Sequence, residues 1–234
     1  MLPLRRTWLL LIFLSGGLSR ISAQQAPDAD WIGLTMPFEL GGKWQLSPEA
    51  GYRTYTSSYL RLQNLLRVTL RYRFNERNNL ASGLAFFTTK LSLDEQEKIY
   101  GREFRLFQEA NHSIPVTNKF NFNQRLRFEQ RFYQATPQFN AYQSLRLRLL
   151  LTGQYSLHRK WFLNLATEYM ESLEKQNLKM DQWRMISFIS FLPVRGLQIN
   201  LGYTYIIRQA YGQNVFILTL FKSFGVNESG QHSS

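Results

Sequence analysis

The chain has 234 residues, of which 44% are hydrophobic, and it contains no cysteine, which excludes disulfide frameworks, thiol catalysis and cysteine zinc sites. Mean hydropathy is −0.31, and after the N-terminus no stretch approaches the ~18 consecutive apolar residues of a spanning helix, which excludes a helical membrane protein. The formal net charge of +12 allows three classes of partner: nucleic acid, an anionic membrane surface or an anionic ligand.

Residues 1–23 are predicted to be a secretory signal peptide. Arg5 and Arg6 supply the positive start, residues 8–14 (WLLLIFL) form a short apolar core, and Ala23 is a small residue at a plausible cleavage point. A membrane anchor is the alternative, but this apolar core is too short to span a bilayer. We therefore expect export through the general secretory pathway.

Residues 119–133 (KFNFNQRLRFEQRFY) show the clearest alternation of apolar and polar side chains. One face carries Phe120, Phe122, Leu126, Phe128 and Phe132, and the other carries Asn121, Asn123, Arg125, Arg127, Glu129 and Arg131. A period of two residues places these sets on opposite faces of one β-strand, whereas a helix would spread the charges around every side.

The same alternation recurs along the chain, with turn residues between the segments. The segments are 29–40, 43–53, 60–74, 79–90, 102–111, 119–133, 142–154, 160–171, 182–191, 196–207 and 213–224. Alternating segments of about 10 residues are typical of a membrane barrel. We predict an all-β fold, a transmembrane antiparallel up-and-down β-barrel of 10–12 strands, as one domain over 24–234, with strands within about 29–224 and a short tail at 225–234.

The number and lengths of the connections predict an orientation. A barrel with both termini in the periplasm has an even number of strands, so eleven segments suggest a miscount, most simply before residue 60. Long extracellular loops and short periplasmic turns are typical of such barrels. The longer links are 91–101, 134–141 and 172–181, and the tight turns are 112–118, 156–160 and 193–196.

The apolar faces are predicted to point outward into lipid. They are uniformly large, whereas the interior of a small soluble barrel must mix small and large side chains; a lipocalin-like barrel with Phe and Leu inside is the alternative. Aromatic residues at or near strand ends predict girdles at the membrane interfaces. These are Trp31, Trp44, Tyr52, Tyr72, Tyr133, Trp161, Tyr169, Trp183, Tyr203 and Phe224.

Several of these strands resemble a known family. An early Trp31, RVTLRYRF at 67–74, RLRFEQR at 125–131, LRLRL at 145–149 and a following strand with Glu168 resemble the Bacteroidota outer-membrane β-barrel family called domain of unknown function 2490. The resemblance covers roughly residues 28–224 and implies a barrel in the outer membrane of a Gram-negative cell, without implying an activity. Barrel proteins often end at an aromatic residue, whereas here ten residues follow Phe224.

Charged residues on the polar faces are the candidate functional residues. Reflecting each strand about its hairpin predicts a belt of alternating sign across about five strands: Glu103, Arg105, Glu109, Arg125, Arg127, Glu129, Arg131, Arg146, Arg148, Glu168 and Arg184. The belt is either a selectivity zone for anions or a plug of salt bridges that fills the lumen, and we favour the plug because desolvated charges need partners. A further set has few acids near it in sequence and faces either lipopolysaccharide or an anion path: Arg61, Arg67, Arg71 and Arg73.

Residues for catalysis are sparse. The three histidines, His112, His158 and His232, fall in turns or the tail, and no nucleophile, zinc or phosphate motif is present, so we expect no enzyme activity, no cofactor and no metal. The cluster of Asp94, Glu95 and Glu97 could bind Ca²⁺, but a solvated loop is the simpler interpretation. Nucleic-acid binding is disfavoured because the basic residues alternate along strands instead of forming one patch.

Three functions remain open. The first is a structural or narrow-channel, porin-like barrel with a charged lumen. The second is an accessory subunit of an outer-membrane export or assembly complex, with a membrane protein partner whose identity is unknown. The third and least favoured is a lipid-modifying barrel enzyme. The expected partners in each case are the lipid bilayer, lipopolysaccharide and the barrel-assembly machinery during insertion.

Overall fold

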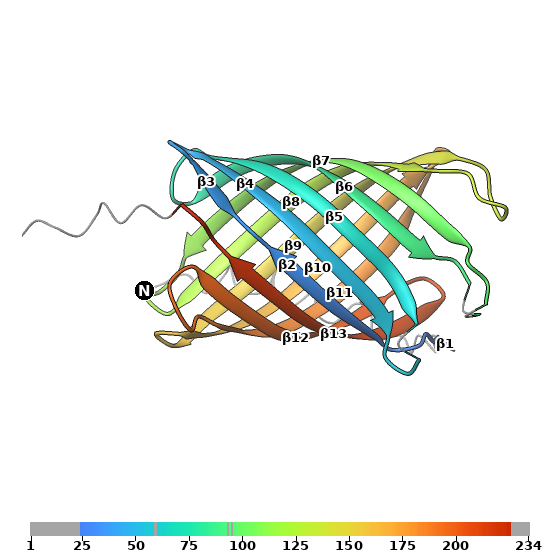
Figure 1. The fold of residues 1–234 in the computed structure, drawn as a ribbon. Coiled ribbons are helices and arrows are strands. Elements are labelled where there is room, and N and C mark those ends of the chain that lie inside the picture. The colour runs from blue at the N-terminus through green and yellow to red at the C-terminus, as the bar shows by residue number, and fades with distance from the viewer. Residues whose placement is uncertain (1–23, 59, 93, 95, 226–234) are drawn as a thin grey trace, which may run out of the picture.

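The chain folds into one closed β-barrel whose strands run obliquely around the wall (Figure 1). The computed structural model describes residues 24–58, 60–92, 94 and 96–225, so the predicted signal peptide, Glu95, His232 and the tail from residue 226 lie outside the described residues. Within this part of the chain, no helix is long and apolar enough to cross a membrane.

Eleven strands form the wall of the described barrel. They are β2 (Ala29–Thr35), β4 (Trp44–Tyr55), β5 (Arg61–Arg73), β6 (Asn78–Lys90), β7 (Tyr100–Pro115), β8 (Phe120–Tyr133), β9 (Tyr142–His158), β10 (Trp161–Glu174), β11 (Asn177–Phe191), β12 (Leu197–Ile207) and β13 (Tyr211–Lys222). Two short strands add to them: β1 (Gln24–Gln25) pairs with β13, and β3 (Phe38–Gly41) pairs with β4 beyond the end of β2. Each of the eleven alternating segments contains one wall strand, and the first segment, 29–40, also contains most of β3. The all-β barrel prediction is confirmed.

The barrel closes through a parallel pairing of β13 with β2, which we call the seam. Val215 lies opposite Ala29 at its start and Phe221 opposite Thr35 at its end, and the other wall strands pair antiparallel with their sequence neighbours. The expectations of an even strand number and a wholly antiparallel barrel are therefore wrong. Each antiparallel neighbour reverses the chain direction, so an odd number leaves the first and last wall strands parallel, with the start of β2 and the end of β13 at opposite ends of the barrel.

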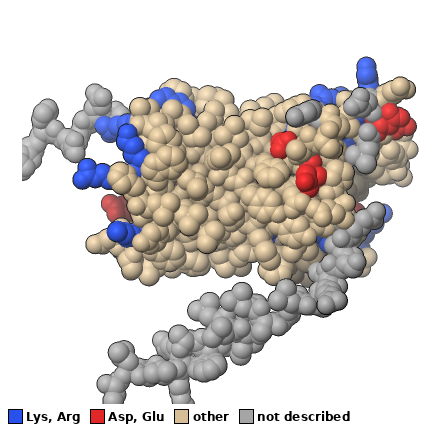
Figure 2. All heavy atoms as spheres, turned by 90° about the horizontal axis from the view of Figure 1, so that it is seen from below, with Lys and Arg blue, Asp and Glu red and all other residues tan. Residues whose placement is uncertain are grey.

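Side-chain exposure shows which face of each strand points outward. Leu201 and Leu66 are 67% and 61% exposed, whereas Glu129 is 1% exposed. On the face shown in Figure 2 the basic side chains gather towards the two ends, and the surface between them is formed mostly by uncharged residues, with a few acidic side chains. The prediction that the apolar faces lie outside is confirmed, because Phe and Leu cover the exterior while the charged residues fill the lumen.

The lumen mixes small and large side chains. Gly83 has no room for a Cβ, because the ring of Phe107 and the carbonyl oxygen of Val68 lie against its Cα. Phe107 is the cross-strand partner of Gly83 and is itself 1% exposed. A residue without a side chain thus makes space for an aromatic ring at the centre of the barrel.

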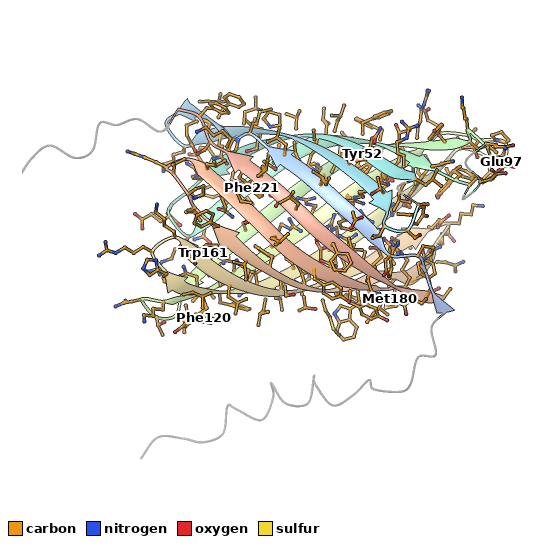
Figure 3. The ribbon with its side chains drawn as sticks, turned by 60° about the horizontal axis from the view of Figure 1, so that its bottom comes forward. Tyr52, Glu97, Phe120, Trp161, Met180 and Phe221 are labelled. Carbon is orange, nitrogen blue, oxygen red and sulfur yellow. The ribbon has the colours of Figure 1, made fainter. Side chains whose placement is uncertain are left out.

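The two ends of the barrel differ in the lengths of their connections. We call the end with links 56–60, 91–99, 134–141, 175–176 and 208–210 the loop end, and the end with links 42–43, 74–77, 116–119, 159–160 and 192–196 the turn end. Glu97 and Met180 lie towards the loop end, and Phe120 and Trp161 lie at the turn end (Figure 3).

The expectation of a long loop at 172–181 is wrong. β10 and β11 are joined by Lys175 and Gln176 alone, with φ angles of 47° and 67°. Two consecutive positive φ angles make the tight hairpin turn that glycine and asparagine usually form. The predicted turn at 112–118 is also shorter than expected, because β7 continues to Pro115.

Two of the ten predicted girdle aromatics lie inside the barrel. Trp31 contacts guanidinium groups in the lumen, and Tyr133 lines a lumen cavity and stacks on Tyr142 with 4.2 Å between ring centroids. Both occupy inward positions of their strands, where a large ring fills space and faces cations. The other eight lie on the outer face, where for example Trp44 and Trp161 are 46% and 43% exposed.

Candidate functional site in the barrel lumen

The lumen holds one continuous set of ion pairs, which we call the lumen network. Its thirteen members are Arg71, Glu103, Arg105, Glu109, Arg125, Arg127, Glu129, Arg131, Arg146, Arg148, Glu168, Asp181 and Arg184. All eleven residues of the predicted belt are in it. They meet because each occupies an inward position of its strand and because the strand register aligns them.

The register brings opposite charges face to face. Glu129 is paired with Arg146 across β8 and β9, and Glu168 with Arg184 across β10 and β11, as reflection about the hairpins predicts. Arg127 faces Arg148, a pair of like charges that the neighbouring Glu129 bridges at 3.6 Å and 2.8 Å.

Glu129 is the centre of the network. Its carboxylate accepts hydrogen bonds from Nε and Nη2 of Arg146 and from Nη1 of Arg148, the last at 2.8 Å. Arg105 and Arg127 lie 3.7 Å and 3.6 Å away. Four guanidinium groups thus surround one fully buried carboxylate, which is the arrangement in which removal of the acid is most costly.

Glu168 forms the second node. Arg125 and Arg148 each donate to its Oε1 at 2.7 Å, and Arg184 approaches its Oε2 at 3.4 Å. Arg148 therefore joins Glu168 to Glu129 across β8, β9 and β10. Such a bridge holds three strands in one register, since sliding any of them would separate the charges.

Two more acids, Glu103 and Glu109, extend the network towards the two ends of the barrel. Glu103 binds Arg105 through two hydrogen bonds of 2.6 Å and 2.7 Å and also accepts from Arg131. Glu109 accepts from Arg127 at 2.6 Å and from Arg71 at 3.3 Å. The forked guanidinium suits these arrangements because it can donate to two carboxylates in one plane.

Aromatic rings pack against the guanidinium groups of Arg105 and Arg127. The guanidinium carbon of Arg105 lies 3.7 Å from the centroid of the Phe87 ring, and that of Arg127 lies 4.5 Å from the Phe107 ring. The edge of each guanidinium donates to carboxylates while its face rests on a ring, which adds cation–π attraction and fixes the side chain.

Asp181 is a network member that sequence reasoning missed. It binds Arg146 at 2.8 Å and lies 3.6 Å from Arg131. The register shifts between Met170 and Glu171, and Asp181 is the unpaired extra residue of that bulge on β11. A bulge breaks the two-residue period, so alternation alone could not place this side chain in the lumen.

The second predicted set, Arg61, Arg67, Arg71 and Arg73, is divided by the structure. Arg67 pairs with Glu49 at 3.1 Å, Arg73 binds both oxygens of Glu39, and Arg71 joins the lumen network. Arg61 faces the ring of Tyr100 at 4.5 Å and has no ion pair among the described residues. Glu49 lies directly opposite Arg67 in the β4–β5 hairpin. Glu39 lies on β3, which pairs with β4 and not with β5, so reflection about the β4–β5 hairpin does not bring it to Arg73.

Cavities lie in the lumen on both sides of the network. A cavity of about 490 Å³ lies on the loop-end side and one of about 290 Å³ on the turn-end side, and Arg125 and Leu150 line both. Glu168 and Arg146 between them are 2% and 3% exposed. Side chains therefore fill the barrel at the level of the network.

Comparison with known proteins places the chain in a family. No curated protein matches it. One family profile, described as protein of unknown function (DUF2490), matches residues 29–216, which include every residue of the lumen network. With this match over most of its length, the chain belongs to the DUF2490 family, a family of unknown function.

Proposed function

We propose that this protein is an outer-membrane β-barrel that is closed to solutes and has a structural role. The observation that carries the proposal is the inverted distribution of side chains, with large apolar groups exposed around the wall and charged groups buried within it. Exposed apolar surface of this extent is stable in lipid and prone to aggregation in water.

The closed lumen favours the structural role over the narrow-channel role. Charges that are bound to each other and desolvated leave no hydrated path at the level of Glu129. The purified protein in planar bilayers should give no conductance steps. Stable, anion-selective steps from the wild-type protein, altered by Arg146→Ala or Arg148→Ala, would overturn the structural role and restore the channel.

The location is tested separately. After density-gradient separation of membranes, the protein should be found in the outer-membrane fraction, and unheated samples should migrate differently from boiled samples on a gel. Recovery in the soluble fraction, with identical migration of both samples, would contradict the membrane proposal whatever the conductance shows.

A second candidate function, accessory subunit of an outer-membrane complex, is favoured by one feature of the outer wall. A depression of about 650 Å³ crosses β4–β9 and is lined by Leu70, Tyr72, Phe128 and other apolar side chains. At its base the polar Ser82 and Gln108 face each other on neighbouring strands. An amide facing lipid is costly, and a partner chain that hydrogen-bonds to it would remove that cost.

Photo-crosslinking tests the accessory role in native membranes. A photoreactive residue at position 108 should give a discrete crosslinked protein, and the same residue at position 201, on the opposite part of the wall, serves as the control. Crosslinks to lipid alone from both positions would dismiss the accessory role.

A further inference from the structure

The cavity on the loop-end side of the lumen, which we call the loop-end cavity, is strongly basic. Ten arginines and three glutamates are among its lining residues. The glutamates are already engaged: Glu49 by Arg67, Glu103 by Arg105 and Arg131, and Glu168 by three arginines. The positive charge of the cavity therefore exceeds what its own acids can balance.

Among the lining arginines, Arg53, Arg102 and Arg208 have no ion pair with the described residues, and the ion pair of Arg184 is long. Of these four, Arg53 and Arg184 lie close to the same indole ring. Arg53 donates to the amide oxygen of Gln63 at 2.6 Å and has no ion pair among the described residues. Arg184 donates twice to the amide oxygen of Gln182, at 3.0 Å and 2.7 Å, and its contact with Glu168 is long, at 3.4 Å. Amide oxygens orient a guanidinium but do not neutralise it.

Trp31 joins these two arginines. The guanidinium carbons of Arg53 and Arg184 lie 3.8 Å and 5.3 Å from the centroid of its ring. Two like charges are thus held beside one indole inside the lumen. Cation–π attraction and fixed amides keep both groups in place against their mutual repulsion, so the site is organised before any ligand arrives.

We propose that the loop-end cavity binds a small organic oxyanion, a solute that carries a phosphate or carboxylate group, through Arg53 and Arg184. Oxyanions are the natural partners of guanidinium forks, and a bound one would supply the missing negative charge. The cavity has a volume of about 490 Å³, which corresponds to on the order of 16 water molecules. It therefore has room for a solute larger than inorganic phosphate.

The geometry fits a binding pocket that opens at the loop end. Leu91 and Phe139, from the links 91–99 and 134–141, line the cavity, and the lumen network lies on its other side. Tyr133 and Tyr142 add ring surface for the body of a solute. The inference depends on the lumen alone and can be tested in detergent, whether or not the outer-membrane proposal holds.

The first test is calorimetric titration of the full-length protein in detergent with glucose 6-phosphate, glucuronate, inorganic phosphate and neutral glucose. At least one organic anion should bind, more weakly at higher salt, whereas glucose should not. Arg53→Gln and Arg184→Gln should each weaken binding at least tenfold, and Arg195→Gln, at the exposed turn 192–196, should not change it. Absence of binding by both organic anions, or equal affinity of a folded Arg53→Gln variant, would overturn the proposal.

A second test needs no variant and so avoids any folding defect. Phenylglyoxal labels accessible arginines, and mass spectrometry measures labelling at each position. The organic anion that binds should protect Arg53 and Arg184 but leave Arg195 reactive. Equal labelling of Arg53 with and without both organic anions would refute the site, and protection by inorganic phosphate as strong as by either organic anion would refute the proposed ligand class.

Discussion

The two sides of the lumen are built differently. On the side of β7–β11 the inward positions carry charges that pair across every strand boundary, as Glu129, Arg148 and Glu168 do. On the side of β12, β13 and β2 the inward positions include Ala29, Ile206 and Val215, each 0% exposed. We call these the charged wall and the neutral wall. Charges fix the register between antiparallel neighbours, whereas the seam between β2 and β13 relies on apolar packing and on hydrogen bonds rather than ion pairs.

In the neutral wall, specific contacts at the two ends of the seam set the pairing of β2 with β13. At the start of the seam, Asn214 donates to the Asp28 carboxylate and Gln213 to the Pro27 carbonyl, both at 2.8 Å. At its end, Phe38 and Phe224 stack with 4.9 Å between their ring centroids. One barrel can thus set the register of its strands in two ways, by ion pairs in the charged wall and by packing and hydrogen bonds in the neutral wall. Variants in each wall distinguish the two.

The largest expected effect is at the centre of the charged wall. Glu129→Gln leaves four guanidinium groups around a neutral amide, and removal of one partner from such a buried network costs about 3–5 kcal/mol. The free energy of unfolding, measured by urea titration in micelles, should fall by that amount.

The matched control is Glu174→Gln. Glu174 pairs with Lys179 at 2.8 Å, where the lysine side chain is 48% exposed, so its loss should cost at most about 1 kcal/mol. Equal effects of the two variants would show that the lumen network adds nothing beyond ordinary surface pairs.

The neutral wall should respond to a loss of volume. Val215→Ala removes two methyl groups from the packed contact with Ala29 and Ile206 and should cost roughly 2 kcal/mol. The same urea titration measures it, with Leu201→Ala on the exposed outer face as the control. A loss equal to that of Glu129→Gln would show that packing at the seam is as important as the ion pairs.

Trp31 belongs to the neutral wall and contacts Arg184 of the charged wall, and its replacement should have a smaller effect. Trp31→Phe keeps a ring beside Arg53 but weakens the cation–π attraction, at a cost of about 1 kcal/mol. The indole Nε1 has no hydrogen-bond partner among the described residues, so its loss removes no hydrogen bond to them. Trp161→Phe, which retains the stack on Phe191, should leave the unfolding free energy unchanged.

The smallest effect is a gain at the β10–β11 hairpin. Replacing Lys175-Gln176 by Asn-Gly places residues that favour positive φ at both positions and should stabilise the protein by ~0.5–1 kcal/mol. Unchanged or lower unfolding free energy would mean that the lysine or glutamine side chain contributes more than the turn conformation.

Much of this arrangement could be predicted from sequence because period-two alternation and hairpin reflection are local rules. They place Glu129 opposite Arg146 and Glu168 opposite Arg184. The predictions that were wrong or incomplete concern features that these local rules do not describe. The bulge turns Asp181 inward, the turn at Lys175 has no glycine or asparagine, and the odd closure depends on a contact between residues such as Ala29 and Val215, far apart in the chain.

For the outer-membrane location proposed above, the parallel seam has a topological consequence for insertion. β2 starts at the loop end, and β13 finishes at the turn end. An even-stranded barrel can keep both chain ends on the side from which it enters the bilayer. In this barrel the start of β2 lies at the loop end. If the loop end enters the bilayer first, the start of β2 crosses the membrane together with the five loop-end connections. Reporters attached at the beginning and the end of the barrel would therefore be reached from opposite sides of the membrane.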